Sequence, residues 1–309
     1  MNMPAFTRPA STQTIVPDHE VIIIGAGISG IGVAIQLRAD GIDDILILER
    51  SEDVGGTWRD NRYPGIAVDI TSFTYSFSFE QNANWSRVFA PGNELHHYTR
   101  RVASKYGIYP LIRFGVEVTR ARFDDANHLW VIELDDGRQL RARHIISAGG
   151  GLISPKMPDI SGLERFEGEV IHTARWPDSL DLTGKRVTVI GTGATAVQLI
   201  PEIAGKAKQL DVYQRTPIWV LKKPDRVLPS WLKTLFRFAP GLQRSLRGAT
   251  DAASETLMVL SAIYYRQAPW LVRMCEKAGI NNLREQLPDH PELWDKLTPK
   301  YGFGCKRPT

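Results

Sequence analysis

The feature that most constrains this chain is a glycine-rich turn that stands between a buried strand and a helix. In the first copy, Gly25, Gly27 and Gly30 match the pattern G-x-G-x-x-G directly after the β-branched run 21–24. The first glycine permits a tight turn, the second lets the backbone approach a pyrophosphate, and the third allows close packing of helix on strand. The N-terminus of the following helix supplies positive potential for phosphates. We therefore predict a dinucleotide-binding unit that continues into a second strand at 44–48.

A second copy of this turn lies further along the chain. The run 187–190 predicts a strand, residues 197–204 predict a helix, and residues 209–214 predict the next strand. Alanine in the third place of the turn is an accepted variant of the pattern. The residues expected to hold a second dinucleotide are Gly191, Thr192, Gly193, Ala194, Thr195 and Ala196.

The residue that closes the second strand differs between the two units. Glu49 and Arg215 stand at the same offset from the first glycine of their turns. A carboxylate in this place accepts hydrogen bonds from ribose hydroxyls, whereas a guanidinium pairs with the 2′-phosphate that NADP carries. The contrast predicts FAD in the first unit and NADPH in the second.

The remaining composition excludes several classes of protein. The chain has 309 residues, a formal net charge of +4 and no block of Lys and Arg, so nucleic acid is not an expected partner. The two cysteines, Cys275 and Cys305, are too far apart for a metal knuckle or a CxxC pair, and they favour a reducing cytoplasm. No apolar run is long enough to cross a membrane, and the first residues do not resemble a secretion signal.

These patterns predict an α/β fold class with two Rossmann-like dinucleotide-binding domains. We expect a flexible tail over 1–18, an FAD-binding domain over 19–155 with an antiparallel β-meander at 115–149, and an NADP-binding domain over 156–309. A helical insertion is expected at about 225–300. Within it, residues 231–247 mix aromatic, leucine and basic side chains. A packed insertion is the favoured interpretation of this stretch, and contact with a membrane surface is the open alternative.

Residues 166–178, FEGEVIHTARWPD, carry a more specific pattern. They resemble F-x-G-x-x-x-H-T-x-x-W-[PD], the signature of the Baeyer–Villiger monooxygenases. The matching positions are Phe166, Gly168, His172, Thr173, Trp176 and Pro177. In that family the histidine is thought to couple the two domains, so His172 is kept outside the catalytic residues.

The resemblance extends to other stretches and implies roles for their residues. Residues 55–58 (GGTW) and 61–70 (NRYPGIAVDI) resemble flavin-side loops of the family, and residues 211–217 and 304–308 resemble its 2′-phosphate loop and a late motif. The implied flavin contacts are Gly56, Thr57, Trp58, Asp69 and Tyr75, with Val118 near the adenine end. Ala67, Val68 and Asp69 would face the nicotinamide nucleotide. Thr216 and Lys306 would join Arg215 at the 2′-phosphate, and Arg307 with Asp69 would be catalytic.

The resemblance also implies an activity. The enzyme would insert one oxygen atom of O2 next to the carbonyl of a ketone or aldehyde through a C4a-peroxyflavin, giving an ester or lactone. Arg307 would stabilise the negative oxygen of the adduct, and Asp69 would orient Arg307. Members of the family are longer than this chain, so the resemblance implies either a fragment or truncated product, or a partner that supplies the elements completing both domains.

Three alternatives stay open at this point. A flavin monooxygenase that oxidises nitrogen or sulfur would use the same cofactors, although Thr173 and Trp176 argue against it. A disulfide-type flavin reductase would need a cysteine pair beside the flavin. A chain that binds nucleotide without catalysis would keep both turns and turn over nothing.

Overall fold

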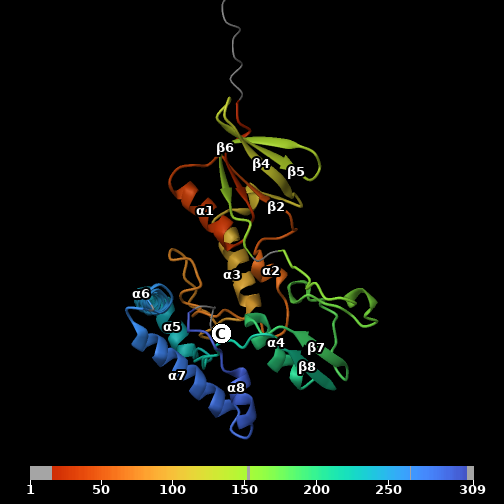
Figure 1. Cartoon of the computed structure of the whole chain (residues 1–309). Helices are drawn as coiled ribbons and strands as arrows, with labels where there is room; N and C mark the ends of the chain where they lie inside the picture. The colour runs from red at the N-terminus through yellow and green to blue at the C-terminus, as the bar shows by residue number, and fades with distance from the viewer. Residues whose placement is uncertain (1–15, 152–153, 265, 305–309) are drawn as a thin grey trace, which may run out of the picture. The chain divides into compact units, whose positions relative to one another are not determined.

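The computed structural model describes residues 16–151, 154–264 and 266–304, so most of the predicted tail lies outside the described residues. The chain divides into two compact units (Figure 1). Unit 1 contains residues up to Gly56 together with Thr99–Gly151, and unit 2 contains Thr57–Tyr98 together with the rest of the chain. The segment Thr57–Tyr98 thus groups with the second nucleotide unit, although it follows the first in sequence. The predicted domain boundary near residue 155 stays a prediction.

Unit 1 is built on one mixed sheet with the strand order β3-β2-β1-β6-β5-β4. Neighbouring strands from β3 to β6 are parallel, and those from β6 to β4 are antiparallel. The predicted meander is therefore confirmed, and it is continuous with the parallel sheet because β6 belongs to both. The elements of this unit are β1 (His19–Ile24), α1 (Ile28–Ala39), β2 (Ile45–Glu49), the 3-10 turn η1 (Tyr109–Leu111), β3 (Ile112–Phe114), β4 (Val118–Asp124), β5 (Leu129–Leu134) and β6 (Gln139–Ser147).

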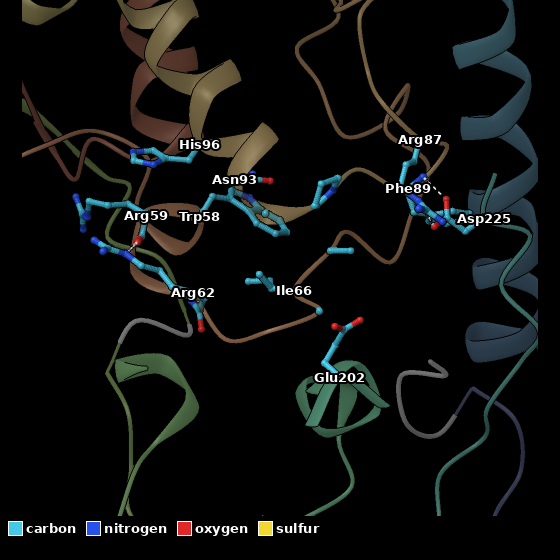
Figure 2. A pocket seen from close by; sticks show the side chains of 15 residues that line it. Trp58, Arg59, Arg62, Ile66, Arg87, Phe89, Asn93, His96, Glu202 and Asp225 are labelled. Carbon is cyan, nitrogen blue, oxygen red and sulfur yellow. Dashed lines mark hydrogen bonds and ion pairs between the residues drawn. The ribbon is translucent and has the colours of Figure 1, made fainter. Parts of the chain in front are cut away.

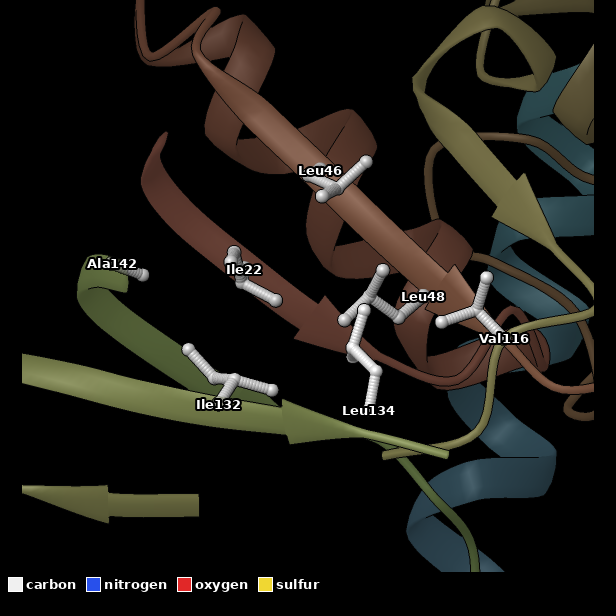
Figure 3. Close-up of a cluster of buried hydrophobic side chains, with 7 residues drawn as sticks. All are labelled: Ile22, Leu46, Leu48, Val116, Ile132, Leu134 and Ala142. Atoms are coloured by element: carbon white, nitrogen blue, oxygen red, sulfur yellow. The ribbon is translucent and has the colours of Figure 1, made fainter. Parts of the chain in front are cut away.

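The core of unit 1 lies on the sheet that carries the first glycine turn. All five residues of β2 are buried, as expected for a parallel strand covered on both faces. Figure 3 shows the hydrophobic cluster on this sheet, which gathers buried side chains of β1, β2, β5 and β6 and of the segment between β3 and β4: Ile22, Leu46, Leu48, Val116, Ile132, Leu134 and Ala142. This packing fixes the ends of β1 and β2, and with them the turn that follows β1.

Unit 2 contains the second nucleotide unit and the helical insertion. Its sheet has only two described strands, β7 and β8, which pair in parallel. The elements are α2 (Thr57–Asp60), η2 (Leu163–Arg165), η3 (Thr173–Arg175), β7 (Arg186–Ile190), α4 (Ala194–Ala204), β8 (Gln209–Tyr213), α5 (Ser230–Phe238), α6 (Pro240–Met258), the π-turn η4 (Val259–Ile263), α7 (Pro269–Gln286), η5 (Pro291–Leu293) and α8 (Trp294–Leu297). Helix α3 (Gly92–Lys105) begins in unit 2 and ends in unit 1.

The structure confirms the fold class and corrects several boundaries. Helix α4 begins at Ala194, so the predicted start at 197 was wrong by one turn, because Gly193 serves as the N-cap. Strand β6 ends the meander at Ser147, within the expected range 115–149, and neither α3 nor β3 was predicted. Helices α5 to α8 lie within the stretch 225–300 for which a helical insertion is predicted, and the bounds of that insertion stay a prediction. Its core contains Trp219, Leu271, Cys275 and Phe303. Within the described part of the chain, no helix is long and apolar enough to cross a membrane.

Candidate nucleotide sites and active site

Two of the three glycines in the first turn, Gly25 and Gly30, are required by close packing, whereas Gly27 has open space beside it. Gly25 has φ of +102°, and a Cβ there would lie 2.6 Å from the carbonyl oxygen of Ala148. A Cβ on Gly30 would lie 2.0 Å from the carbonyl oxygen of Gly25, so the helix could not approach the strand. A Cβ on Gly27 would meet nothing closer than 3.9 Å. Packing therefore explains Gly25 and Gly30, whereas the open space at Gly27 fits a bound phosphate.

The second turn repeats the backbone of the first. Gly191 has φ of +105°, and its N–H donates to the carbonyl of Tyr213 at 2.9 Å, as the N–H of Gly25 donates to Leu48 at 2.8 Å. Nothing lies within 4 Å of a Cβ built on Gly193. The third position, Ala196, is buried. The predicted residues 191–196 are thus brought together in one strand–turn–helix.

Both helices present their N-termini without a protein cap. The N-cap residues Gly27 and Gly193 have nearly the same conformation, with φ and ψ of −75° and −176° in the first and −71° and −177° in the second. Neither N-cap makes a side-chain hydrogen bond, and neither helix has an acidic residue in its first turn. The free N–H groups and the helix dipole therefore remain available to an anion.

Glu49 closes β2 as a buried acid, with 5% of the residue exposed. Its Oε2 accepts the N–H of Ala26 at 2.8 Å, and its Oε1 accepts the N–H of Ser51 at 3.0 Å. A carboxylate has about four acceptor sites, so it can also accept ribose hydroxyls. Gly56, with φ of +52°, passes the same turn, and its Cβ would lie 3.2 Å from the Cα of Gly27. The predicted residues Gly25, Gly27, Gly30, Glu49 and Gly56 therefore lie together.

Arg215 differs from Glu49 in that it is exposed. Its side chain makes no hydrogen bond or ion pair with any other described residue. Thr216, beside it, is partly buried. An exposed guanidinium after β8 fits a 2′-phosphate, which it can bind with two parallel hydrogen bonds.

Two of the predicted flavin contacts touch each other. The indole N–H of Trp58 donates to the hydroxyl of Tyr75 at 3.1 Å, and the rings meet edge to face with centroids 5.2 Å apart. Thr57 begins the short helix α2 that carries Trp58. Val118 lies elsewhere, at the start of β4, where it packs against the hydrophobic cluster of unit 1.

Gln198 on α4 is a residue that the sequence analysis missed. Its amide donates to the carbonyl of Ala67 at 3.0 Å and to Oδ1 of Asp69 at 3.1 Å. Its Oε1 accepts the hydroxyl of Tyr63 at 2.9 Å. A Cβ on Gly65 would lie 2.4 Å from the carbonyl oxygen of Gln198, so the two segments are in close contact. The second nucleotide helix thus holds the segment that carries Ala67, Val68 and Asp69.

Lys223 holds the same segment from another side and was also missed. Its ammonium group donates to the carbonyl of Val68 at 2.7 Å and lies 4.5 Å from the centre of the Phe89 ring. The residue as a whole is exposed, but its ammonium group is partly desolvated. This desolvation lowers the pKa of Lys223, and the carboxylates of Asp69 and Asp225 oppose the shift.

A cavity of about 620 Å³ opens beside these residues (Figure 2). Trp58 and Ala67 line it, together with His96 and Asn93 of α3 and Glu202 of α4. Three arginines also line it, each paired with an aspartate: Arg59 with Asp60, Arg62 with Asp178 and Arg87 with Asp225, at 2.7–2.8 Å. The cavity therefore combines aromatic surface with basic groups, which suits a polar planar ligand.

The signature 166–178 forms a turn structure outside this cavity. A Cβ on Gly168 would lie 2.5 Å from the ring of Phe166, so glycine is needed there. His172 caps η3, and its Nδ1 accepts the N–H of Ala174 at 3.1 Å. Trp176 packs against Tyr63, Leu199 and Ile203. The signature thus contributes packing through Trp176 and a helix cap through His172. The exclusion of His172 from the catalytic residues stays a prediction. The predicted Lys306 and Arg307 lie outside the described residues.

Comparison with known proteins agrees with this geometry. The family model described as pyridine nucleotide-disulphide oxidoreductase matches residues 22–240. A Baeyer-Villiger monooxygenase of Pseudomonas aeruginosa is 41% identical over 288 residues, covering 93% of this chain and 54% of the relative. The FAD-binding monooxygenase ktnD of Aspergillus niger is 38% identical over 315 residues, covering 97% of this chain and 51% of the relative. This chain therefore spans about half the length of these curated relatives.

Solved structures give the same result. The crystal structure of the OTEMO complex with FAD and NADP has a TM-score of 0.79 at 31% identity, covering 95% of this chain and 62% of that one. An oxidized steroid monooxygenase bound to NADP has a TM-score of 0.79 at 30% identity, covering 91% of this chain and 60% of that one. The resemblance to the Baeyer–Villiger monooxygenases is confirmed, and the chain belongs to the pyridine nucleotide-disulphide oxidoreductase family.

Proposed function

We propose that this protein is an FAD- and NADPH-dependent monooxygenase that converts a ketone or aldehyde to an ester or lactone with O2. One observation carries the choice of cofactors, and the similarity to named monooxygenases supports the oxygenation. Two strand–turn–helix units share one backbone, but the first ends in the buried acid Glu49 and the second in the exposed base Arg215. This contrast fits a flavin dinucleotide in unit 1 and a phosphorylated nicotinamide in unit 2.

The described residues fit both cofactors. Open space at Gly27 and Gly193, together with two uncapped helix N-termini, accommodates the pyrophosphates. When bound, NADPH supplies a hydride and FAD supplies the electron transfer and oxygen activation. The protein supplies orientation. Trp58 and Tyr75 fix each other by a hydrogen bond and an edge contact, which makes them a rigid aromatic wall for the flavin.

The chain also fixes the segment proposed to face the nicotinamide. Gln198 binds the backbone of Ala67 and the carboxylate of Asp69, and Lys223 binds the backbone of Val68. A backbone held from two sides loses little further freedom when a ligand arrives, so binding costs less entropy. Asp69 is proposed as the carboxylate that orients the catalytic Arg307. The roles of Arg307 and Lys306 are proposed from the family resemblance alone.

The proposal extends to compartment and substrate class. The two cysteines of the sequence favour a reducing compartment such as the cytoplasm. Small carbonyl compounds are the proposed substrates, since the relatives are named as Baeyer-Villiger and FAD-binding monooxygenases.

Product analysis tests the proposal. The intact protein would be incubated with FAD, NADPH, 18O2 and a panel of cyclic and linear ketones, with a sulfide as the competing substrate. We expect labelled ester or lactone, with one labelled oxygen beside the carbonyl. Sulfoxide formed without any ester would instead assign the chain to sulfur oxidation, and a protein that binds no FAD would overturn the proposal.

A further inference from the structure

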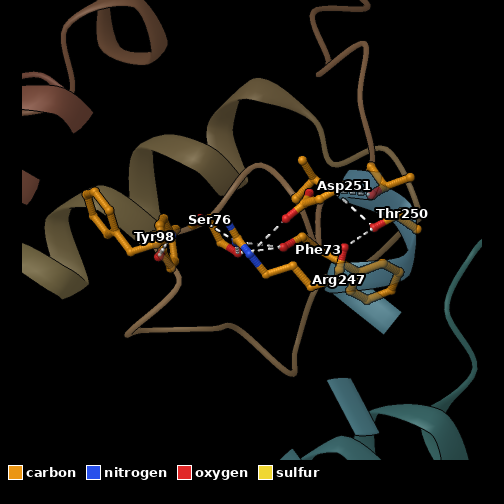
Figure 4. A network of polar contacts seen from close by, with 9 residues as sticks. Phe73, Ser76, Tyr98, Arg247, Thr250 and Asp251 are labelled. Atoms are coloured by element: carbon orange, nitrogen blue, oxygen red, sulfur yellow. Dashed lines mark hydrogen bonds and ion pairs between the residues drawn. The ribbon is translucent and has the colours of Figure 1, made fainter. Parts of the chain in front are cut away.

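Helix α6 directs polar side chains toward the rest of unit 2. Gln243, with 2% of the residue exposed, donates to the carbonyl of Asn82 at 2.9 Å. Arg247 donates to the carbonyls of Phe73 at 3.1 Å and Ser76 at 2.6 Å (Figure 4). Thr250 lies one turn further on the same face. Ordinary amphipathic helices turn an apolar stripe inward, so the polarity of this helix is unusual.

The apolar side chains of α6 lie on a different, solvent-exposed stripe. Leu242, Leu246, Ala249 and Ala253 recur at the spacing of one helix face, and all four are exposed. None of them packs in the hydrophobic clusters of the described residues. The inward polar face already anchors the helix, so the apolar stripe is not needed for that attachment.

Helix α5, which precedes α6 and contacts it, also has an exposed apolar face. Its inner side is attached by Phe236, which meets the ring of Phe73 edge to face at 5.6 Å. The other face carries Trp231, Leu235 and Phe238, which are spaced by four and three residues. Their exposed fractions are 67%, 38% and 85%, respectively. Within the described part of the chain, two large aromatic side chains are therefore exposed on a helix that is otherwise well attached.

The same stretch is positively charged. Residues 226–250 contain five basic residues and no acidic residue: Arg226, Lys233, Arg237, Arg244 and Arg247. Arg247 faces inward, and Arg237 binds the side-chain oxygen of Asn84 at 2.6 Å. Arg226 and Arg244 are exposed. Tryptophan, phenylalanine and leucine beside basic groups are the composition of helices that lie in the interface of an anionic membrane.

We propose that α5 and the first half of α6 bind the surface of a membrane that contains anionic lipids, lying in its plane without crossing it. Contact with a second copy of the chain would cover the apolar stripe, but it would also bring two acid-free, basic segments together. An anionic bilayer provides an apolar environment for the stripe and negative charge for the basic side chains. This inference goes beyond the proposed oxygenation and does not depend on it.

Vesicle flotation of the intact protein tests the proposal. One set of vesicles contains phosphatidylcholine alone, and the other also contains phosphatidylglycerol. We expect binding to the anionic vesicles that weakens as salt is raised, because salt screens surface charges. The double variant Trp231→Ser/Phe238→Ser should bind at least about ten-fold more weakly, since it removes two apolar side chains from the interface. Arg244→Gln should weaken binding to the anionic vesicles about five-fold.

A matched control is Tyr213→Ser, which removes an exposed aromatic residue of β8. This variant should bind as the unsubstituted protein does, and circular dichroism should show that all variants are folded. Three outcomes would overturn the proposal: no flotation with anionic vesicles, equal binding to both kinds of vesicle, or equal loss in the control. Self-association that disappears in the Trp231→Ser/Phe238→Ser variant, without lipid binding, would assign the surface to a second copy instead.

Discussion

The two nucleotide units have the same turn, but very different amounts of structure support it. In unit 1 the turn follows a strand at the centre of a six-stranded sheet, and its neighbour β2 is wholly buried. In unit 2 the turn follows one of two described strands, and Ile190, Val212 and Tyr213 are exposed. Yet the first glycines have φ of +102° and +105°.

This difference shows that the shape of the turn is a local property. The pairing of the two strands, the glycine at positive φ and the uncapped helix start are present in both units. The surrounding sheet adds rigidity and burial without changing the turn. In unit 2, helix α4 instead connects the turn to another segment, because Gln198 on this helix donates hydrogen bonds to Ala67 and Asp69.

The largest expected effect is that of Gly30→Ala in the well-supported unit. Its Cβ would lie 2.0 Å from the carbonyl oxygen of Gly25, so strand and helix must separate. Overpacking that forces the backbone to move typically costs about 1–3 kcal/mol, and occasionally more. We expect loss of flavin binding and a clear fall in the free energy of unfolding, measured by urea denaturation. Gly149→Ala is the control, because nothing lies within 4 Å of a Cβ there. Equal stability of the two variants would refute the steric argument.

Arg215→Ala tests the contrast in charge. A charged hydrogen bond contributes about 1.5–3 kcal/mol, so the preference for NADPH over NADH should fall about ten- to one-hundred-fold. The measurement is the ratio of the two dissociation constants. Lys208→Ala removes another exposed basic residue close to β8 and should leave the ratio unchanged. An unaltered preference in Arg215→Ala would remove that residue from the site.

Gln198→Ala tests whether α4 positions the Asp69 segment. The substitution removes hydrogen bonds to Ala67, Asp69 and Tyr63. Poorer positioning should lower the rate of flavin reduction by NADPH about ten-fold, with a smaller change in NADPH affinity. Stopped-flow absorbance gives both quantities. The control is Gln209→Ala, at an exposed glutamine in β8. A loss of NADPH affinity with no change in the rate of flavin reduction would mean that Gln198 contributes only to binding.

The last comparison is between the two sheets, and it includes the smallest expected effect. Val21→Ala in β1 removes buried methyl groups and should cost about 2 kcal/mol. Val212→Ala in β8 alters an exposed side chain and should change the free energy of unfolding by less than about 0.5 kcal/mol. Thermal unfolding monitored by circular dichroism measures both. A large loss in Val212→Ala would show that β8 is covered in the native protein.

The local elements were predictable, and the reason is visible in their contacts. The conformations of the turns at Gly25 and Gly191 are determined by residues close in sequence and by one strand pairing, so a short stretch of sequence is enough to predict them. The Glu49 and Arg215 contrast is equally local. The fold class followed from these two units, since a parallel strand pair with a crossover helix leaves few arrangements.

The contacts of the candidate active site were not predictable in the same way. Gln198 reaches Asp69 across 129 positions of the chain, and Lys223 reaches Val68 across 155. No periodicity in either stretch indicates such a partner, because only the tertiary fold brings them together. The inward face of helix α6 was not predictable for a different reason. Its inward polar side chains bind backbone carbonyls of residues 73–82, which a pattern of apolar positions cannot reveal.

The empty space at Gly27 and Gly193 has an evolutionary consequence. Neither position is needed as glycine for packing, since a methyl group there would touch only what the turn binds. A single mutation could therefore abolish recognition of one dinucleotide while the domain continues to fold. Descendants of such a protein would keep the fold and lose the activity. The residues at positions 27 and 193 therefore distinguish an active oxygenase from an inactive homologue better than overall similarity does.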